Sequence, residues 1–363
     1  MIKAAGYFTM ITPDISVNHL IGQIRSADKQ VRNAAREKMN SLVKPPGSLG
    51  RLEDCAIQYA AARGDLDAPL CNPVILTFAA DHGITEEGIS ITDAKTTTQM
   101  VQCMIQGGAG ISVLTRLHGI QHRIIDVGMM YPCASPCIIN RSIAKGTRNF
   151  TQGPAMTEAQ CISAIKAGMA EAETAIVRTG STLLGTGEIG IGNTTPSAAL
   201  YSVLLDLPPE DVCGYGSGIS QEQLQHKIQL VKKGIQVNRT AVFQGPFQSL
   251  TALGGFEIAA ITGMILQAAA LRIPVLIDGY IASAAAIAAI RMKQEVLDYC
   301  FFSHLSGDHG HLAAMTAMGI RPLLDLQLRL GEGTGAALAY PVIRSAHALL
   351  HQMMSFSRAG ISL

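Results

Sequence analysis

The chain has 363 residues, of which 48% are hydrophobic and 15% are charged, and it contains 36 glycines. This composition supplies a sizeable buried core and excludes a disordered chain or a coiled coil. The 28 basic and 27 acidic side chains leave a formal charge of +1. No electrostatic footprint for nucleic acid or an anionic membrane stands out, so an anionic ligand must be held locally.

The apolar stretches do not predict a membrane protein. The two longest, 258–271 and 279–290, are shorter than the roughly 18 residues that a membrane span needs. No uninterrupted apolar stretch follows Lys3, and Pro13 comes early, so we expect no secretory signal and a cytoplasmic protein. The eight cysteines include no Cys-x-x-Cys pair, and we expect free, structural thiols rather than disulfides or zinc ligands.

Both ends of the chain are predicted to be helical. Residues 16–63 are expected to be mainly helical, interrupted by a turn at 44–48 that contains two prolines and a glycine. Helical character returns after Gly335, and Pro341 is expected near a first helical turn. We expect the two ends to pack together as a small helical domain. That domain would comprise residues 1–70 and 336–363.

Between these ends, short apolar runs rich in β-branched residues alternate with polar or glycine-rich turns and helical segments. The alternation predicts βαβ units, and therefore an α/β fold with a parallel, Rossmann-like sheet in a large catalytic domain of residues 71–335. Ligands of such sheets bind outside the carboxyl ends of the strands, so the polar residues there predict one crevice. The predicted strands are 74–80, 124–127, 182–184, 275–277 and 300–302.

Two glutamates stand in segments that we expect to be glycine-rich loops, Glu188 within 185–190 and Glu332 within 329–335. Flanking glycines let the backbone approach a ligand closely, and apolar neighbours raise the pKa of a carboxyl group, as a general base requires. A solvated loop glutamate is the alternative for either residue. The occurrence of two such settings in one chain favours a role in chemistry.

Residues 185–190 read GTGEIG and formally satisfy the dinucleotide-binding pattern G-x-G-x-x-G. The match is weak, because Thr195 followed by Pro196 predicts that the helix begins only after the glycines. Backbone N–H groups at that helix start, with the hydroxyls of Thr194 and Thr195, would form a cup for a single phosphate. Simple capping of the helix by Asn193 to Thr195 is the alternative.

Residues 303–311 form the densest group of histidines and aspartates. We favour hydrogen-bonded structural histidines over a metal site there, because the His-x-His pair has no well-placed carboxylate. Asp81 and His82 point to opposite faces if the chain is extended, and Asp81 is the better candidate for the site. There is no G-x-S-x-G elbow. The G-x-x-x-x-G-K-[ST] phosphate loop is absent too, which argues against an NTPase.

Several segments, taken together, carry a more specific signal, and they follow one another in order from Lys44 to Ala337. They resemble the nicotinate-nucleotide:dimethylbenzimidazole phosphoribosyltransferases of cobamide synthesis. The resemblance implies transfer of the 5-phosphoribosyl group of nicotinate mononucleotide to a ring nitrogen of a benzimidazole-type base, with inversion at the anomeric centre. It also implies a homodimer and neither a metal nor an organic cofactor. The segments are KPPGSLGRLE (44–53), ADHG (80–83), GE (187–188), NTTP (193–196), DGY (278–280), SH (303–304) and RLGEG (329–333).

The same resemblance implies roles for individual residues. Glu332 would be the general base that removes the N–H proton of the incoming base. Glu188 would be a second catalytic carboxylate, which we hypothesise stabilises positive charge developing on the ribose. Phosphate and ribose would be bound by Gly192, Asn193, Thr194, Thr195, Lys227, Asp278 and Ser306, with Asp278 accepting from the ribose hydroxyls. The base would be bound by Asp81, Thr92, Met100 and Leu330.

Thr92 and Met100 depart from the family, whose members have a serine and a glutamine lining the base pocket. Methionine forms no strong hydrogen bond, so the accepted base could be dimethylbenzimidazole, a related benzimidazole, a purine or a phenol. An alignment shifted by one residue would place Gln99 there instead. Two other functions stay open, a dinucleotide-dependent oxidoreductase and a non-catalytic nucleotide sensor, although a sensor has no use for a base such as Glu332.

Overall fold

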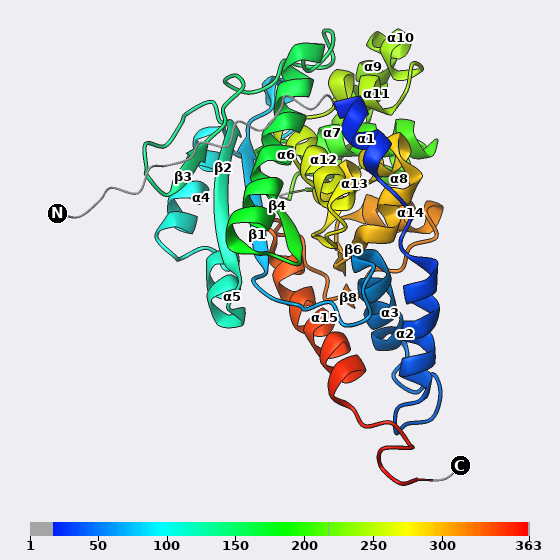
Figure 1. Cartoon of the computed structure of the whole chain (residues 1–363). Helices are drawn as coiled ribbons and strands as arrows, with labels where there is room; N and C mark the ends of the chain where they lie inside the picture. Colours follow the sequence, from blue (N-terminus) through cyan, green and yellow to red (C-terminus); the bar gives the residue numbers. More distant parts are fainter. Residues whose placement is uncertain (1–16, 217, 362–363) are drawn as a thin grey trace, which may run out of the picture.

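The structure is a computed structural model that describes residues 17–216 and 218–361. The expectation of no secretory signal concerns residues outside the described ones. Within the described residues, parallel strands form a six-stranded sheet in the order β3-β2-β1-β4-β5-β6 (Figure 1). This confirms the predicted α/β class and the parallel, Rossmann-like sheet. The strands are β1 (Val74–Ala80), β2 (Gln121–Gly128), β3 (Ile138–Asn140), β4 (Leu184–Ile189), β5 (Val275–Ile277) and β6 (Cys300–Phe302).

Helices cover both faces of the sheet (Figure 1). Alternate residues of β1 serve the two faces, because successive side chains of a strand point in opposite directions. Leu76 and Phe78 pack on one side, and Ile75 and Ala79 on the other. The first side is covered by α6 (Glu158–Thr179), α7 (Thr194–Leu205), α12 (Phe256–Ala270) and α13 (Tyr280–Met292); the second by α4 (Lys95–Ile105), α5 (Gly110–His118) and α15 (Thr334–Gln352).

The remaining elements are short or lie around this frame. Two of them, β7 and β8, pair as a small parallel sheet. Among the described helices, none combines the length and the apolar character needed to cross a membrane. These elements are α1 (Val17–Gln23), α2 (Lys29–Asn40), α3 (Arg51–Arg63), η1 (Gly83–Glu87), α8 (Pro209–Val212), α9 (Gln221–Val237), α10 (Arg239–Val242), α11 (Pro246–Leu253), η2 (Gln294–Tyr299), β7 (His304–Leu305), α14 (His309–Ala317) and β8 (Leu324–Asp325).

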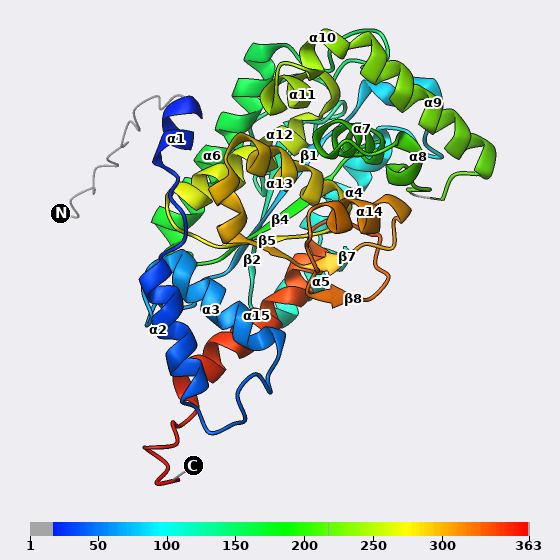
Figure 2. The same ribbon diagram turned by 90° about the vertical axis from the view of Figure 1, so that its right-hand side faces the viewer.

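Two helices from the first part of the described chain pack against its last helix. Helices α2 and α3 lie beside α15 (Figure 2), and Val43 N donates to Met354 O at 2.9 Å. Helix α1 instead packs through Leu20 on the other side of the sheet, with α6 and α12. The division of the chain into 1–70 plus 336–363 and 71–335 stays a prediction. Pro341 lies inside α15 and not near its first turn, because the helix already begins at Thr334.

Two further local predictions were wrong. The strand expected at 182–184 is β4, Leu184–Ile189, so Glu188 lies in a strand and not in a glycine loop. A Cβ at Gly187 would lie 2.4 Å from the carbonyl oxygen of Glu332, so this glycine serves close packing of two distant segments. The N-cap of α7 is Asn193 and not Thr195, so Pro196 is not the first helical residue.

Candidate active site

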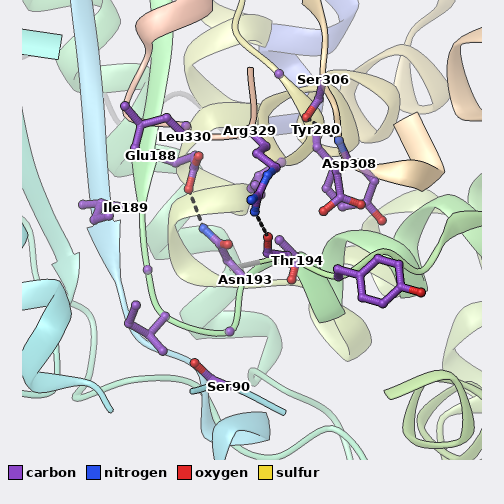
Figure 3. Close-up of a pocket in the computed structure, with 18 of the residues that line it drawn as sticks. Ser90, Glu188, Ile189, Asn193, Thr194, Tyr280, Ser306, Asp308, Arg329 and Leu330 are labelled. Atoms are coloured by element: carbon purple, nitrogen blue, oxygen red, sulfur yellow. Dashed lines mark hydrogen bonds between the residues drawn. The ribbon is translucent and has the colours of Figure 1, made fainter. Parts of the chain in front are cut away.

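A pocket opens at the carboxyl ends of β4 and β5, close to the point where the strand order reverses between β1 and β4. Figure 3 shows Asn193 and Thr194 between Glu188 on one side and Asp308 on the other. The structure thus brings together residues that are far apart in the sequence. The predicted site residues that line this pocket are Glu188, Gly192, Asn193, Thr194, Lys227, Asp278, Ser306 and Leu330.

The start of α7 and a buried lysine lie together at the place where the sequence predicts a phosphate cup. Lys227 Nζ donates to Thr194 Oγ1 at 2.9 Å and to Gly214 O at 3.0 Å. An ammonium group has three N–H donors, so one is left for a ligand. Burial lowers the pKa of Lys227, and the negative charge of Asp308 opposes that shift. Thr195 is fully buried and lies outside the pocket lining.

One histidine of the predicted cluster, His311, supports Ser306. Ser306 N donates to His311 Nδ1 at 2.8 Å, and His311 Nε2 lies 3.1 Å from Ser283 Oγ. Burial lowers the pKa of His311 to about 3, so the ring is neutral. Because Nδ1 accepts from Ser306 N, the ring proton is on Nε2. Among the described residues, no three His, Cys, Asp or Glu side chains gather in a way that could hold a metal ion. The bonds of His311 to Ser306 and Ser283 fit the structural interpretation of this residue.

Glu188 is a buried carboxyl group in the pocket wall. Asn193 Nδ2 donates to Glu188 Oε2. Burial raises the pKa of Glu188 to about 8, and the negative charges of Asp278, Glu257 and Glu332 add to this shift. A group with this pKa changes its protonation state near neutral pH, as acid–base and charge-stabilising residues do.

Glu332 lies directly behind the pocket wall. Its neighbours Leu330 and Gly331 line the pocket, whereas its own carboxylate Oε2 accepts from Ile111 N, in the first turn of α5, at 3.1 Å. Glu332 N donates to Glu188 O at 3.1 Å, so the two glutamates lie on adjacent backbones. Burial raises the pKa of Glu332 as well.

Asp278 lines the pocket, but its carboxylate already holds the loop that contains Glu332. It accepts from Gly333 N at 3.1 Å and from Ala336 N at 3.0 Å. These donors belong to the start of α15, where a carboxylate is favoured. Burial raises the pKa of Asp278 nonetheless. Its role toward the ribose therefore stays a prediction, whereas its role in fixing the loop is direct.

Two predicted base-binding residues lie away from this pocket, and another residue was missed. Thr92 is exposed and Met100 half-buried, and neither is among the described residues that line the pocket. Ser90 lines it instead, and Thr92 N donates to Ser90 Oγ at 3.2 Å in a tight turn. The turn directs Thr92 outward. A resemblance based only on the spacing of residues could not predict this turn.

Asp81 is not among the described residues that line the pocket, but it is bonded to a residue that positions the pocket wall. It accepts from Thr97 Oγ1 at 2.6 Å and from Met130 N at 2.7 Å, and Thr97 Oγ1 accepts from Ile191 N at 3.2 Å. Asp81 thus holds, through Thr97, the segment at Ile191 that leads to the start of α7. Burial raises its pKa. Further pocket residues that the sequence did not single out for the site are Tyr215, Tyr280, His304, Asp308 and Arg329.

A pH experiment can test the buried state of Glu188. Its pKa is about 8 in the folded chain and 4.5 for an ordinary glutamate, so the folded state binds this proton more tightly. The stability linked to this proton is fully present below about pH 4.5 and is lost as the pH rises to about 8. For Glu188→Gln, the free energy of unfolding relative to wild type should therefore rise by about 1.4 kcal/mol per pH unit across this window. Urea unfolding between pH 4 and pH 9 measures this, and a constant difference would show that the pKa of Glu188 is not raised in the folded chain.

Comparison with known proteins defines the class first. A family described as "Phosphoribosyltransferase" matches residues 24–361. Relatives named nicotinate-nucleotide–dimethylbenzimidazole phosphoribosyltransferase include one from Chlorobium chlorochromatii, 47% identical over 344 residues, covering 94% of this chain and 97% of the relative. Another, from Citrifermentans bemidjiense, is 43% identical over 343 residues and covers 94% of this chain and 97% of the relative.

Solved structures agree with this. The crystal structure of CobT from Thermus thermophilus matches with a TM-score of 0.86 and 40% identity, over 92% of this chain and 99% of that chain. The chain is therefore a phosphoribosyltransferase by fold and sequence. It belongs to the nicotinate-nucleotide–dimethylbenzimidazole phosphoribosyltransferase family. The G-x-G-x-x-G pattern that raised the oxidoreductase alternative lies largely in β4 and does not open a helix.

Proposed function

We propose that this enzyme transfers the 5-phosphoribosyl group of nicotinate mononucleotide to 5,6-dimethylbenzimidazole or a similar lower-ligand base. The products are α-ribazole 5′-phosphate and nicotinate, for cobamide synthesis. The observation that carries the proposal is the buried Lys227 ammonium at the start of α7, with Glu188 in the wall of the same pocket. A phosphate and a ribose that becomes cationic need these two groups side by side.

The proposed reaction places each group in turn. The 5′-phosphate binds the N–H groups of Gly192 and Thr194 and the third donor of Lys227. The bond between C1′ and the pyridinium nitrogen breaks, and its electron pair returns to nicotinate. Ionised Glu188 stabilises the positive charge on the ribose. The ring nitrogen of the base attacks C1′ from the opposite face, and Glu332 takes the N–H proton.

We further propose that the enzyme works in the cytoplasm and, as the sequence resemblance implies, forms a homodimer. All eight cysteines are free thiols, which is the usual state in a reducing compartment. The buried ones have raised pKa values, about 12 for Cys161 and about 12 for Cys213, because burial disfavours the thiolate. Light scattering that gives the mass of a single chain would contradict the dimer.

The direct test of the reaction is a product assay. The purified protein is incubated with nicotinate mononucleotide and, separately, dimethylbenzimidazole, adenine or p-cresol, and chromatography follows nicotinate and the riboside. We expect release of nicotinate with matching formation of the α-riboside from dimethylbenzimidazole. If folded protein that binds the mononucleotide releases no nicotinate with any acceptor, the proposal fails in favour of a nucleotide sensor.

A further inference from the structure

Thr77 is a polar residue in a strand whose other residues are apolar. Strand β1 reads VILTFAA, and every one of its residues is buried. A buried hydroxyl needs hydrogen-bond partners. Thr77 Oγ1 donates to Glu332 O at 2.9 Å and lies 2.9 Å from His122 Nε2. A hydroxyl has one proton and a carbonyl can only accept, so His122 must be the donor to Thr77.

His122 suits this task because its ring is neutral. Burial lowers its pKa to about 4, so it is uncharged at neutral pH. The proton on Nε2 then completes a chain from His122 through the Thr77 hydroxyl to the carbonyl of Glu332. This series of hydrogen bonds ends at a residue of the proposed active site. Neither Thr77 nor His122 is itself among the described residues that line the pocket.

Glu332, at the end of this series of hydrogen bonds, has an unusual backbone conformation. Glu332 has a φ of 65°, which is uncommon for a residue with a side chain. Such a conformation costs on the order of 1 kcal/mol or more and persists where the surroundings enforce it, often at functional sites. Here Glu332 N is held by Glu188 O, its carbonyl by Thr77, and the next N–H, of Gly333, by Asp278.

The contact also explains a glycine of the GTGEIG pattern. A Cβ at Gly187 would lie 2.4 Å from Glu332 O and 2.5 Å from Thr77 Oγ1, too close for any side chain. The absence of a side chain at this position lets the loop of Glu332 lie directly on β4 and reach the hydroxyl in β1. The pattern that resembles a dinucleotide fingerprint therefore serves the approach of these two segments.

We propose that Thr77, supported by His122, is a positioning residue that fixes the backbone of Glu332 so that its carboxylate is aligned for proton transfer. The inference rests on the proposed role of Glu332 as general base. Loss of the Thr77 hydroxyl removes the donor to the Glu332 carbonyl while the phosphate cup stays intact. Displacement of a catalytic group by about 1 Å can lower the rate by on the order of a hundredfold.

The test compares Thr77→Val, which keeps the shape and loses the hydroxyl, with Thr77→Ser, which keeps the hydroxyl. We expect Thr77→Val to lower kcat by about tenfold to a hundredfold, with the KM for nicotinate mononucleotide within about twofold of wild type, and Thr77→Ser to restore most of kcat. Thr262→Val is the matched control. Thr262 is a fully buried threonine of α12 whose hydroxyl is within bonding distance of Ile258 O and Ala285 O, and its loss should leave kcat unchanged.

The outcomes separate this inference from the proposed function. If Glu332→Gln is inactive but Thr77→Val has wild-type kcat, the positioning role is wrong. If Glu332→Gln keeps full activity, the proposed general base is wrong. A Thr77→Val loss that Thr77→Ser does not restore would also overturn the positioning role. Should Thr77→Val not fold, His122→Leu removes the donor behind Thr77, and an unchanged kcat in that variant would refute the chain.

Discussion

Glu332→Gln is expected to lower kcat by about 10²-fold to 10⁴-fold, the usual contribution of a general base. Binding of nicotinate mononucleotide should change little, because the Glu332 carboxylate bonds to Ile111 N behind the pocket wall and not to the phosphate cup. Glutamine keeps an oxygen that can accept from Ile111 N, so the strained loop should stay in place. The loss would then report the missing proton acceptor alone.

Single-turnover kinetics and calorimetric titration of the mononucleotide measure the two quantities separately. Glu86→Gln, a change of the same type in η1 near the surface and outside the pocket lining, is the matched control and should keep wild-type kcat. An equal loss of binding and turnover in Glu332→Gln would make Glu332 a ligand contact. If Glu332→Gln kept wild-type kcat, another group would have to remove the N–H proton of the acceptor base.

The sheet could be predicted where strands are buried on both faces. Val74–Ala80, Val275–Ile277 and Cys300–Phe302 are continuous apolar runs, and the structure confirms these bounds. Strand β4 was misplaced because its glycines resemble a loop. Gly187 is instead required by its contact with Glu332, more than a hundred residues away along the chain, and Gly185 by its contact with Ile75 of β1. No local signal in the sequence reports a contact over that separation.

The site could be predicted in part for a similar reason. Glu188, Lys227 and Ser306 come together in one pocket, as strand ends and the family resemblance predicted. What could not be predicted was how each side chain is used. The carboxylate of Asp278 accepts from backbone N–H groups at the start of α15. The hydroxyl of Thr77, in a buried strand, donates to the carbonyl oxygen of Glu332. Such uses depend on three-dimensional neighbours that a motif does not contain.

Lys227→Met is expected to raise the KM and Kd for nicotinate mononucleotide by roughly tenfold to a hundredfold or more, with kcat at saturation within about threefold of wild type. A hydrogen bond to a charged group contributes about 1.5–3 kcal/mol, and each 1.4 kcal/mol corresponds to about tenfold in affinity. In the proposed reaction, Lys227 contacts the phosphate equally in the ground state and the transition state. Loss of this contact should therefore weaken binding and leave the chemical step unchanged.

The variant is expected to lose stability, because it leaves the buried Asp308 without its positive neighbour and Gly214 O without its donor. Circular dichroism and thermal unfolding therefore establish that it is folded at the assay temperature before its kinetics are compared. Lys232→Met is the matched control, since Lys232 lies on the same helix but is exposed and pairs with Glu210. It removes the same charge from α9 and should leave KM unchanged. Equal effects of the two variants would mean that the net charge of α9, and not the cup, attracts the phosphate. Loss of kcat at saturating mononucleotide in Lys227→Met would place Lys227 in the chemical step.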